Sequence, residues 1–342
     1  MTTDGVAGDR TGAAGIRFGF IPTEGGRMFR EALAEVELGE ALGFDSVWIE
    51  EHHGVRDHYW PSPLVAAAAF AARTSRIALG TDVIVASFYG AVRLAEDVAV
   101  LEALSDGRFT LGVGLGYKPD EFALYDAPLE RRGERLEELL PVLRALWRGE
   151  RVDHEGRHLV VHGSIEPVPP TPPAIWIGGW GPKTLERAAR LADAWVPGPT
   201  ADLARLAGLR RDYDAALVAA GRDPTSVPRP LTRDVVIAET DAEAWRLAER
   251  HLLVSYRDEY GGSWRHPIIG ATDSPRVDSL DELVRDRLIV GGPERCIRQL
   301  RRFVDELGVD QVIFRLYFPG VPHEHVVAEL KLLAGEVIPA FR

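Results

Sequence analysis

The stretch IRFGFIPTEGGRMFREALAEVELGEALGFDSVWIEEHH, residues 16–53, decides the fold. It predicts a buried strand, an amphipathic helix over residues 28–43 and a second buried strand over residues 45–50. Two carboxylates and two imidazoles close the second strand. Because strand-helix proteins place their chemistry at the carboxyl ends of strands, His52 and His53 are the first candidates for function.

The same strand-helix unit recurs along the rest of the chain, about eight times in one uninterrupted series. The expected strands cover residues 16–22, 45–50, 76–85, 108–114, 174–179, 193–198, 234–239 and 310–317. This series favours a single TIM-like (β/α)8 barrel domain over residues 16–342, rather than a two-domain doubly wound protein. The pattern fails between about residues 256 and 290, which predicts an insertion after strand seven. The polar, Gly-rich residues 1–15 predict a disordered tail.

Composition narrows the classes of partner. With 342 residues and 46% hydrophobic content, the chain can build a large core. Its 40 basic and 52 acidic residues give a formal charge of -12, which disfavours nucleic acid or an anionic membrane as the main partner. Its one cysteine, Cys296, excludes a disulfide within the chain and is expected to pack inside a helix. Residues 1–15 resemble neither a signal peptide nor an anchor, so we expect a cytoplasmic protein.

Two glycine-rich segments follow predicted strands. GVGLGYKPDEF, residues 112–122, has the wrong spacing for a dinucleotide fingerprint and leads into a loop, so its glycines either admit a flat ligand or make a flexible turn. In IWIGGWGPKTLERAARLADAW, residues 175–195, glycines precede a helix that begins near Lys183 and Thr184. Free amides, a hydroxyl and an ammonium at this helix start predict a site for a ligand phosphate, and a simple helix cap is the alternative.

The segment HEGRH, residues 154–158, matches a zinc-protease pattern. That chemistry needs a helix to bring both imidazoles onto one face, but Gly156 lies at the centre and the flanking residues alternate as in a β-hairpin. We therefore predict a hairpin that turns at Glu155 and Gly156, and no metal site.

The adjacent histidines at 52 and 53 also have a structural alternative, because both could be satisfied by the backbone and only fill the end of the barrel. Consecutive strand residues point to opposite faces, so at most one of the two is expected to face the central cavity. Tyr59 and Trp60 could stack on a ligand or shield the loop.

Four segments together resemble successive blocks of the bacterial-luciferase-like flavin monooxygenases. They are GFDSVWIEEHH, PLVAAAAFAARTSRIALGTDVIV, AVRLAEDVAVLEALSDGRFTLGVGLGYKPDEF and PPAIWIGGWGPKTLERAARLADAW, and the match in order and spacing covers most of residues 16–342. The resemblance implies a TIM-like barrel that binds reduced FMN, without a covalent link, at the carboxyl ends of its strands. A separate NAD(P)H-dependent flavin reductase would supply the FMN. Oxygen would add at flavin C4a, and the resulting hydroperoxide would insert one oxygen atom into an organic substrate.

The resemblance also implies roles for individual residues. His52 matches the active-site histidine of the family and would act as a general acid or base, with Glu51 and His53 orienting it or lining the pocket. Asp82 and Val83 match the site of a non-prolyl cis peptide under the flavin ring, although an acidic residue here replaces a small apolar one.

Strand four matches further positions of the flavin pocket. Gly114 takes the place of a reactive cysteine, Tyr117 follows in the same pocket, and Leu115 takes the place of a flavin-binding arginine. The phosphate contacts are therefore assigned to other residues, namely Gly179, Trp180, Gly181, Lys183, Thr184 and either Arg131 or Arg132.

Three functions remain open. The first is an FMN-dependent monooxygenase that acts on a small to medium, largely apolar compound, plausibly in secondary metabolism. The second is a hydride-transferring oxidoreductase that uses the deazaflavin coenzyme, and the third is a non-catalytic flavin-binding partner subunit. The resemblance implies a dimer, expected to be a homodimer, that buries the second and third helices.

Overall fold

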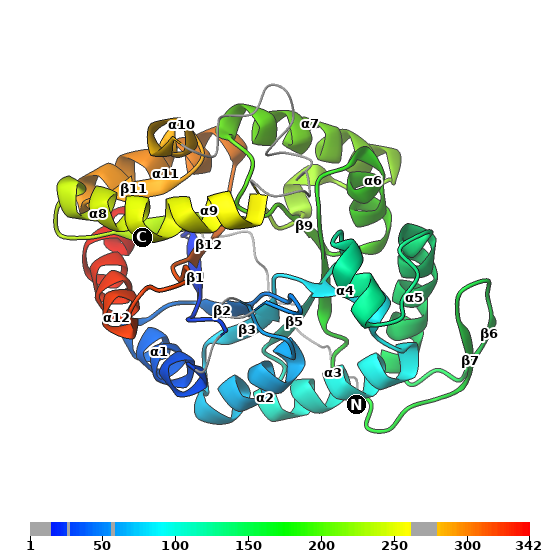
Figure 1. Ribbon diagram of the computed structural model, residues 1–342. Coiled ribbons are helices and arrows are strands. Elements are labelled where there is room, and N and C mark those ends of the chain that lie inside the picture. The colour runs from blue at the N-terminus through cyan, green and yellow to red at the C-terminus, as the bar shows by residue number, and fades with distance from the viewer. Residues whose placement is uncertain (1–14, 26–27, 56–58, 261–278) are drawn as a thin grey trace, which may run out of the picture.

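The computed structural model describes residues 15–25, 28–55, 59–260 and 279–342 (Figure 1). A parallel sheet runs through its centre in the order β11-β10-β12-β1-β2-β3-β5-β8-β9, and the short β4 pairs with β5. The strands are β1 (Arg17–Ile21), β2 (Ser46–Ile49), β3 (Ala78–Thr81), β4 (Ile84–Val85), β5 (Phe109–Gly114), β8 (Ala174–Gly178), β9 (Ala194–Val196), β10 (Pro230–Ile237), β11 (Ile289–Gly291) and β12 (Gln311–Arg315).

The sheet curls so that the α-helices form a ring around it, as Figure 1 shows. The helices are α1 (Phe29–Leu42), α2 (Pro63–Arg73), α3 (Ala91–Ser105), α4 (Pro119–Leu124), α5 (Arg132–Trp147), α6 (Pro182–Leu191), α7 (Leu203–Ala219), α8 (Asp241–Leu247), α9 (Leu253–Tyr260), α10 (Leu280–Val284), α11 (Pro293–Leu307) and α12 (His323–Leu332). Shorter helical turns are η1 (Ala86–Phe88), η2 (Pro224–Ser226), η3 (Ala248–Leu252), η4 (Leu333–Val337) and η5 (Ile338–Phe341). The predicted TIM-like α/β fold is confirmed, and within the described residues the hydrogen-bonded strand order ends at β9 on one side and at β11 on the other.

Apolar periodicity explains why the helices lie where they do. In α11 the buried residues Cys296, Leu300, Phe303 and Leu307 recur at helical spacing and pack on the sheet, as expected for Cys296. Position 19 requires glycine because β1 and β2 approach closely there, and a Cβ on residue 19 would lie 2.2 Å from Ser46 Oγ on the neighbouring strand.

The seventh strand differs from its prediction. The expected residues were 234–239, but β10 begins four residues earlier, at Pro230, and all eight of its residues are buried. The start of this strand could not be predicted, because the polar side chains of Thr232 and Arg233 interrupt its apolar pattern. Arg233 is tolerated in the interior because its Nη1 donates to the carbonyl of Pro199 at 2.5 Å.

Two smaller features flank the barrel. Residues 154–158 do form a hairpin, with β6 (Val152–Glu155) antiparallel to β7 (Val160–Gly163), so this segment is not the helix that the zinc-protease pattern requires. The predicted insertion contains α9, α10 and the unexpected strand β11, which pairs with the end of β10. The rest of that insertion, residues 261–278, and nearly all of the predicted tail lie outside the described residues. Within the described chain, no helix combines the length and apolarity needed to span a membrane.

Candidate active site

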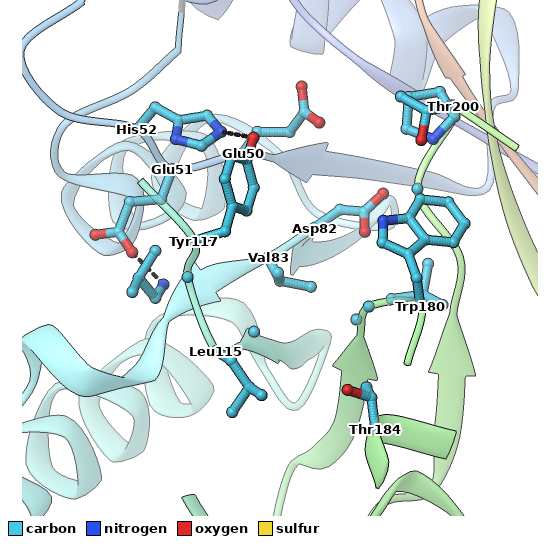
Figure 2. Close-up of a pocket in the computed structure, with 18 of the residues that line it drawn as sticks. Glu50, Glu51, His52, Asp82, Val83, Leu115, Tyr117, Trp180, Thr184 and Thr200 are labelled. Atoms are coloured by element: carbon cyan, nitrogen blue, oxygen red, sulfur yellow. Dashed lines mark hydrogen bonds between the residues drawn. The ribbon is translucent and has the colours of Figure 1, made fainter. Parts of the chain in front are cut away.

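A cavity of about 460 Å³ opens at the carboxyl ends of the central strands. Most of the predicted site residues line it: Glu51, His52, Asp82, Val83, Gly114, Tyr117, Arg132, Gly179, Trp180, Gly181 and Thr184. Two do not, because His53 points behind the cavity wall and Lys183 lies on α6 outside the lining. Figure 2 shows His52, Glu51 and Tyr117 on one side of this space and Trp180, Thr184 and Thr200 on the other.

His52 is held at both ring nitrogens. Its Nδ1 lies 2.7 Å from Glu121 Oε1, and its Nε2 lies 3.2 Å from the hydroxyl of Tyr117 (Figure 2). The ring of Tyr59 packs against His52 edge-on, with 4.4 Å between ring centroids. A carboxylate on Nδ1 favours the tautomer with its proton there, which directs Nε2 toward Tyr117 and the cavity.

Glu121 is buried and serves two groups at once, since Oε1 also accepts from the backbone N–H of His53 at 2.9 Å. Burial alone would raise the pKa of Glu121, but hydrogen bonding to His52 and to the His53 amide brings it below its usual value. The side chain is therefore a carboxylate at neutral pH and a fixed acceptor for His52.

His53 lies beyond the end of β2, in a bend of the chain, and does not line the cavity. Its Nδ1 lies 2.9 Å from the Tyr125 hydroxyl, and its Nε2 lies 3.3 Å from Glu51. Glu51 in turn accepts from the Val85 amide and from the Tyr89 hydroxyl. Burial, followed by the charge of Glu51, raises the pKa of Tyr89. This network supports the cavity wall from behind.

The floor of the cavity is apolar and close-packed. The Asp82–Val83 peptide is cis, at the position that the family resemblance implied. Val83 projects over the ends of β5 and β8, where a Cβ on Gly114 would lie 2.7 Å from Val83 Cγ2. Glycine at 114 therefore keeps the floor flat enough for a planar ligand.

The deep end of the cavity is charged. Thr232 donates to Asp82 Oδ2 from the opposite side of the barrel. Burial raises the pKa of Asp82 to about 6, although Thr232 and the nearby Arg315 both lower it. Arg315 lies at the cavity wall and bonds to Asp234, with 2.5 Å between its Nε and Asp234 Oδ1.

The other end of the cavity is the start of α6. Gly181 is the N-cap of this helix, and Thr184 lies one turn in, buried against the cavity. Gly179 has φ +133, and a Cβ there would lie 3.0 Å from the Thr184 methyl group. Arg132 donates to the carbonyls of Gly116 and Leu129, at 3.0 and 2.9 Å. Amides at the helix start, a hydroxyl and a nearby guanidinium suit an anionic group such as a phosphate.

Several contributors to this site were not singled out in the sequence. Glu121 lies in the quoted segment 112–122 but its partner His52 is 69 residues away. Thr232 and Asp234 come from the strand whose start was misplaced, and Arg315 appeared only as part of strand eight. An acidic residue two positions after a proline at a helix start was the available signal for Glu121. Among the described residues, no group of three or more His, Cys, Asp or Glu side chains is arranged to hold a metal ion.

Comparison with known proteins identifies the family. Residues 13–311 match the model of the luciferase-like monooxygenases. The chain belongs to this family. A flavin-dependent trigonelline monooxygenase, oxygenase component, from Acinetobacter baylyi is 23% identical, with 92% of this chain and 90% of the relative covered. An F420-dependent glucose-6-phosphate dehydrogenase from Kineococcus radiotolerans is 27% identical, with 89% and 90% covered.

A solved structure agrees on the fold. The monooxygenase RslO1 from Streptomyces bottropensis superimposes with a TM-score of 0.81 at 24% identity, covering 96% of this chain and all of the other. The relatives of this chain thus include both a monooxygenase and an F420-dependent dehydrogenase. Both are oxidoreductases, so an oxidoreductase is the activity class that the relatives have in common.

Proposed function

We propose that this protein is an FMN-dependent monooxygenase that uses reduced FMN and O2 to oxygenate a small to medium organic substrate. The observation that carries the proposal is His52, fixed by Glu121 and Tyr117 at the edge of a cavity with a flat apolar floor. When bound, reduced FMN supplies the electrons that activate O2, and the chain supplies orientation, shielding and proton handling.

The residues present fit FMN. Val83 and the glycines beside it offer a flat surface to an aromatic ring, and the start of α6 offers amides and Thr184 to a phosphate. FMN carries one terminal phosphate, which matches a single helix start better than a long anionic tail would. The start of α7 adds Arg205 at the same end of the cavity.

In this proposal, His52 exchanges a proton at Nε2 with the substrate or with the reacting oxygen, because Nδ1 is held by Glu121. Tyr117 hydrogen-bonds to the same nitrogen and extends the path for that proton into the cavity. Glu51, Val83 and Leu115 line the enclosed wall and limit the access of water. We further propose a separate NAD(P)H-dependent reductase as the source of reduced flavin.

A second candidate is hydride transfer with the deazaflavin coenzyme, as the name of the Kineococcus relative implies for that protein. The observation that favours it is Leu115, which lines the cavity where the resemblance implies a flavin-binding arginine. A third candidate, a non-catalytic flavin-binding subunit, agrees less well with a histidine held at both ring nitrogens.

The test is anaerobic loading with reduced FMN followed by rapid mixing with O2. We expect oxidised FMN to reappear much more slowly than from free reduced FMN, and His52→Ala to shorten that delay by at least tenfold. His158→Ala, on the exposed hairpin, is the matched control and should behave as the wild type.

Two outcomes would exclude the proposal. If the protein fails to bind FMN but binds the deazaflavin coenzyme, hydride transfer replaces it. If reduced FMN binds but is oxidised by O2 as fast as free reduced FMN, the third candidate, a non-catalytic flavin-binding subunit, replaces the monooxygenase proposal.

A further inference from the structure

Two carboxylate residues follow neighbouring strands and line the same cavity. Ile49 and Thr81 are register partners of β2 and β3, and each is followed directly by an acidic residue, Glu50 and Asp82. Both acidic residues line the cavity. Strand pairing therefore places both residues at the same edge of the sheet.

Arg315 supplies positive charge at this end, but its ion pair with Asp234 neutralises much of that charge. Arg315 Nε and Nη2 reach the two carboxylate oxygens of Asp234, at 2.5 and 3.1 Å, while Nη1 lies 3.5 Å from Glu50. A two-bond contact of this kind matches one guanidinium to one carboxylate. The carboxylates of Glu50, Asp82 and Asp234 thus outnumber the guanidinium of Arg315 three to one when all are ionised.

Glu24 lies behind Glu50 and does not line the cavity. It is fully enclosed beside Glu50, whose backbone N–H donates to Glu24 Oε1 at 2.8 Å. Burial, followed by the charge of Glu50, raises the pKa of Glu24 well above its usual value and so favours its neutral form.

Asp82 is the carboxylate best placed to meet a ligand. Thr232 occupies its Oδ2, and Oδ1 has no hydrogen-bond partner within the described part of the chain. Figure 2 shows Asp82 in the space between Tyr117 and Trp180. A carboxylate between aromatic rings in an enclosed space is an arrangement that recognises organic cations, through charge and cation–π attraction.

We propose that Asp82 is a specificity-determining residue that selects substrates with a positively charged nitrogen, either an ammonium group or a cationic heteroaromatic ring. The proposal rests on the proposed function, since it names the substrate class of the same cavity. The cationic nitrogen binds beside Asp82 Oδ1, with Glu50 as a second negative charge. Anionic substrates are rejected by the same two carboxylates.

Three further cationic side chains lie near the cavity. Lys118 Nζ lies 5.6 Å from the centroid of the Tyr59 ring, and the Tyr59 hydroxyl accepts from Arg315 Nη1 at 3.2 Å, so Lys118 is near the carboxylate end. Arg132 and Arg205 line the end nearest α6 and α7. His52 lines the cavity beyond the end of β2. Low pH is expected to weaken cation binding, because Asp82 is protonated as the pH falls below about 6.

The test uses choline and its uncharged isostere 3,3-dimethyl-1-butanol as probes, with binding measured by calorimetry. Both the flavin-free protein and the complex with oxidised FMN are titrated. At pH 7.5 we expect choline to bind about tenfold more tightly than the isostere, a difference of about 1.4 kcal/mol. Asp82→Asn should abolish that preference and leave affinity for the isostere unchanged.

The controls separate Asp82 from its surroundings. Asp212→Asn removes an exposed carboxylate from α7 and should leave the preference intact. Between pH 7.5 and 5 the wild type should lose choline affinity more steeply than Asp82→Asn does, because only the wild type titrates at this position. The wild-type preference alone tests the proposal if Asp82→Asn does not fold.

Equal affinity for choline and the isostere in the wild type would overturn the proposal. An Asp82→Asn variant that binds FMN differently but keeps the preference for choline would also overturn it, by assigning Asp82 to the flavin. Failure of the monooxygenase proposal is distinguishable, because it appears in FMN binding and oxidation and not in the ratio of the two probes.

Discussion

At the scale of single residues, the contact between Glu121 and His52 makes the sharpest prediction. Glu121→Ala removes the acceptor for both His52 Nδ1 and the His53 amide, and leaves two buried donors without it. We expect a loss of about 1–3 kcal/mol in the free energy of unfolding, measured by urea denaturation at pH 7. Glu121→Gln keeps an oxygen at the same place and should retain most of the stability.

The same pair of variants tests whether Glu121 positions His52. Glu121→Ala should shorten the delay in FMN oxidation nearly as much as His52→Ala, whereas Glu121→Gln should have an intermediate effect. Asp120→Asn, next to it on α4 and exposed, is the control. A purely structural role would be indicated if Glu121→Ala lowered stability but left the delay unchanged. Because the pKa of Glu121 is lowered by folding, its contribution is present above about pH 4.3 and is lost as pH falls through the folded value.

Residue identity could be predicted from the sequence where a local rule applied. Strand alternation predicted that at most one of His52 and His53 would face the cavity, and His52 is the one that does. Glu121, Thr232 and Arg315 could not be predicted in this way, because their partners are brought close only by the closing of the sheet. The interaction of Asp82 with Thr232 joins residues 150 positions apart.

At the scale of elements, the start of α6 predicts how FMN is held. Thr184 is buried at the cavity, and its hydroxyl is the side-chain donor of this helix start. Thr184→Val conserves shape but removes the hydroxyl, so FMN affinity should fall about tenfold, as expected for one lost hydrogen bond to a charged group. Riboflavin, which lacks the phosphate, should bind the variant and the wild type equally in fluorescence titrations.

The comparison of FMN with riboflavin is its own control. Equal losses for both ligands would mean that Thr184 supports the cavity shape and does not contact the phosphate. No loss for either ligand would remove the start of α6 from the proposed phosphate site.

Helices and strands with a regular spacing of apolar residues could be predicted from the sequence. Elements in which polar residues interrupt that spacing could not. The hairpin of β6 and β7 was predicted from the alternating residues around Gly156, and the structure contains that hairpin. The start of β10 was missed because Thr232 and Arg233 face opposite sides of a strand that is buried on both. The three-residue β11 is too short to show a period at all.

At the scale of the whole molecule, the repeat count alone led to the TIM-like fold. Eight strand-helix units without a long linker leave few other ways to bury every strand on both faces. The count could not predict that the hydrogen-bonded order of the described strands ends at β9 and β11, because each of these strands has only three residues.

The outer face of α2 and α3 makes the last prediction. The two helices are neighbours, and their outward residues include apolar side chains with large exposed fractions, 72% for Val65 and 52% for Leu104. Ala69 and Ala72 continue the exposed side of α2 with small residues that permit close helix approach. We propose that this face forms a homodimer, because burial at an interface would stabilise the exposed apolar side chains of α2 and α3.

Light scattering during size-exclusion chromatography should give twice the mass of the 37.6 kDa chain for the wild type. Val65→Glu and Leu104→Glu should each shift the equilibrium to monomer, since burying an unpaired carboxylate at an interface is costly. Val160→Glu is the matched control, because Val160 is 66% exposed on the distant β6–β7 hairpin. The proposal would be wrong if the wild type were a monomer. It would also be wrong if both substituted proteins, Val65→Glu and Leu104→Glu, remained dimers.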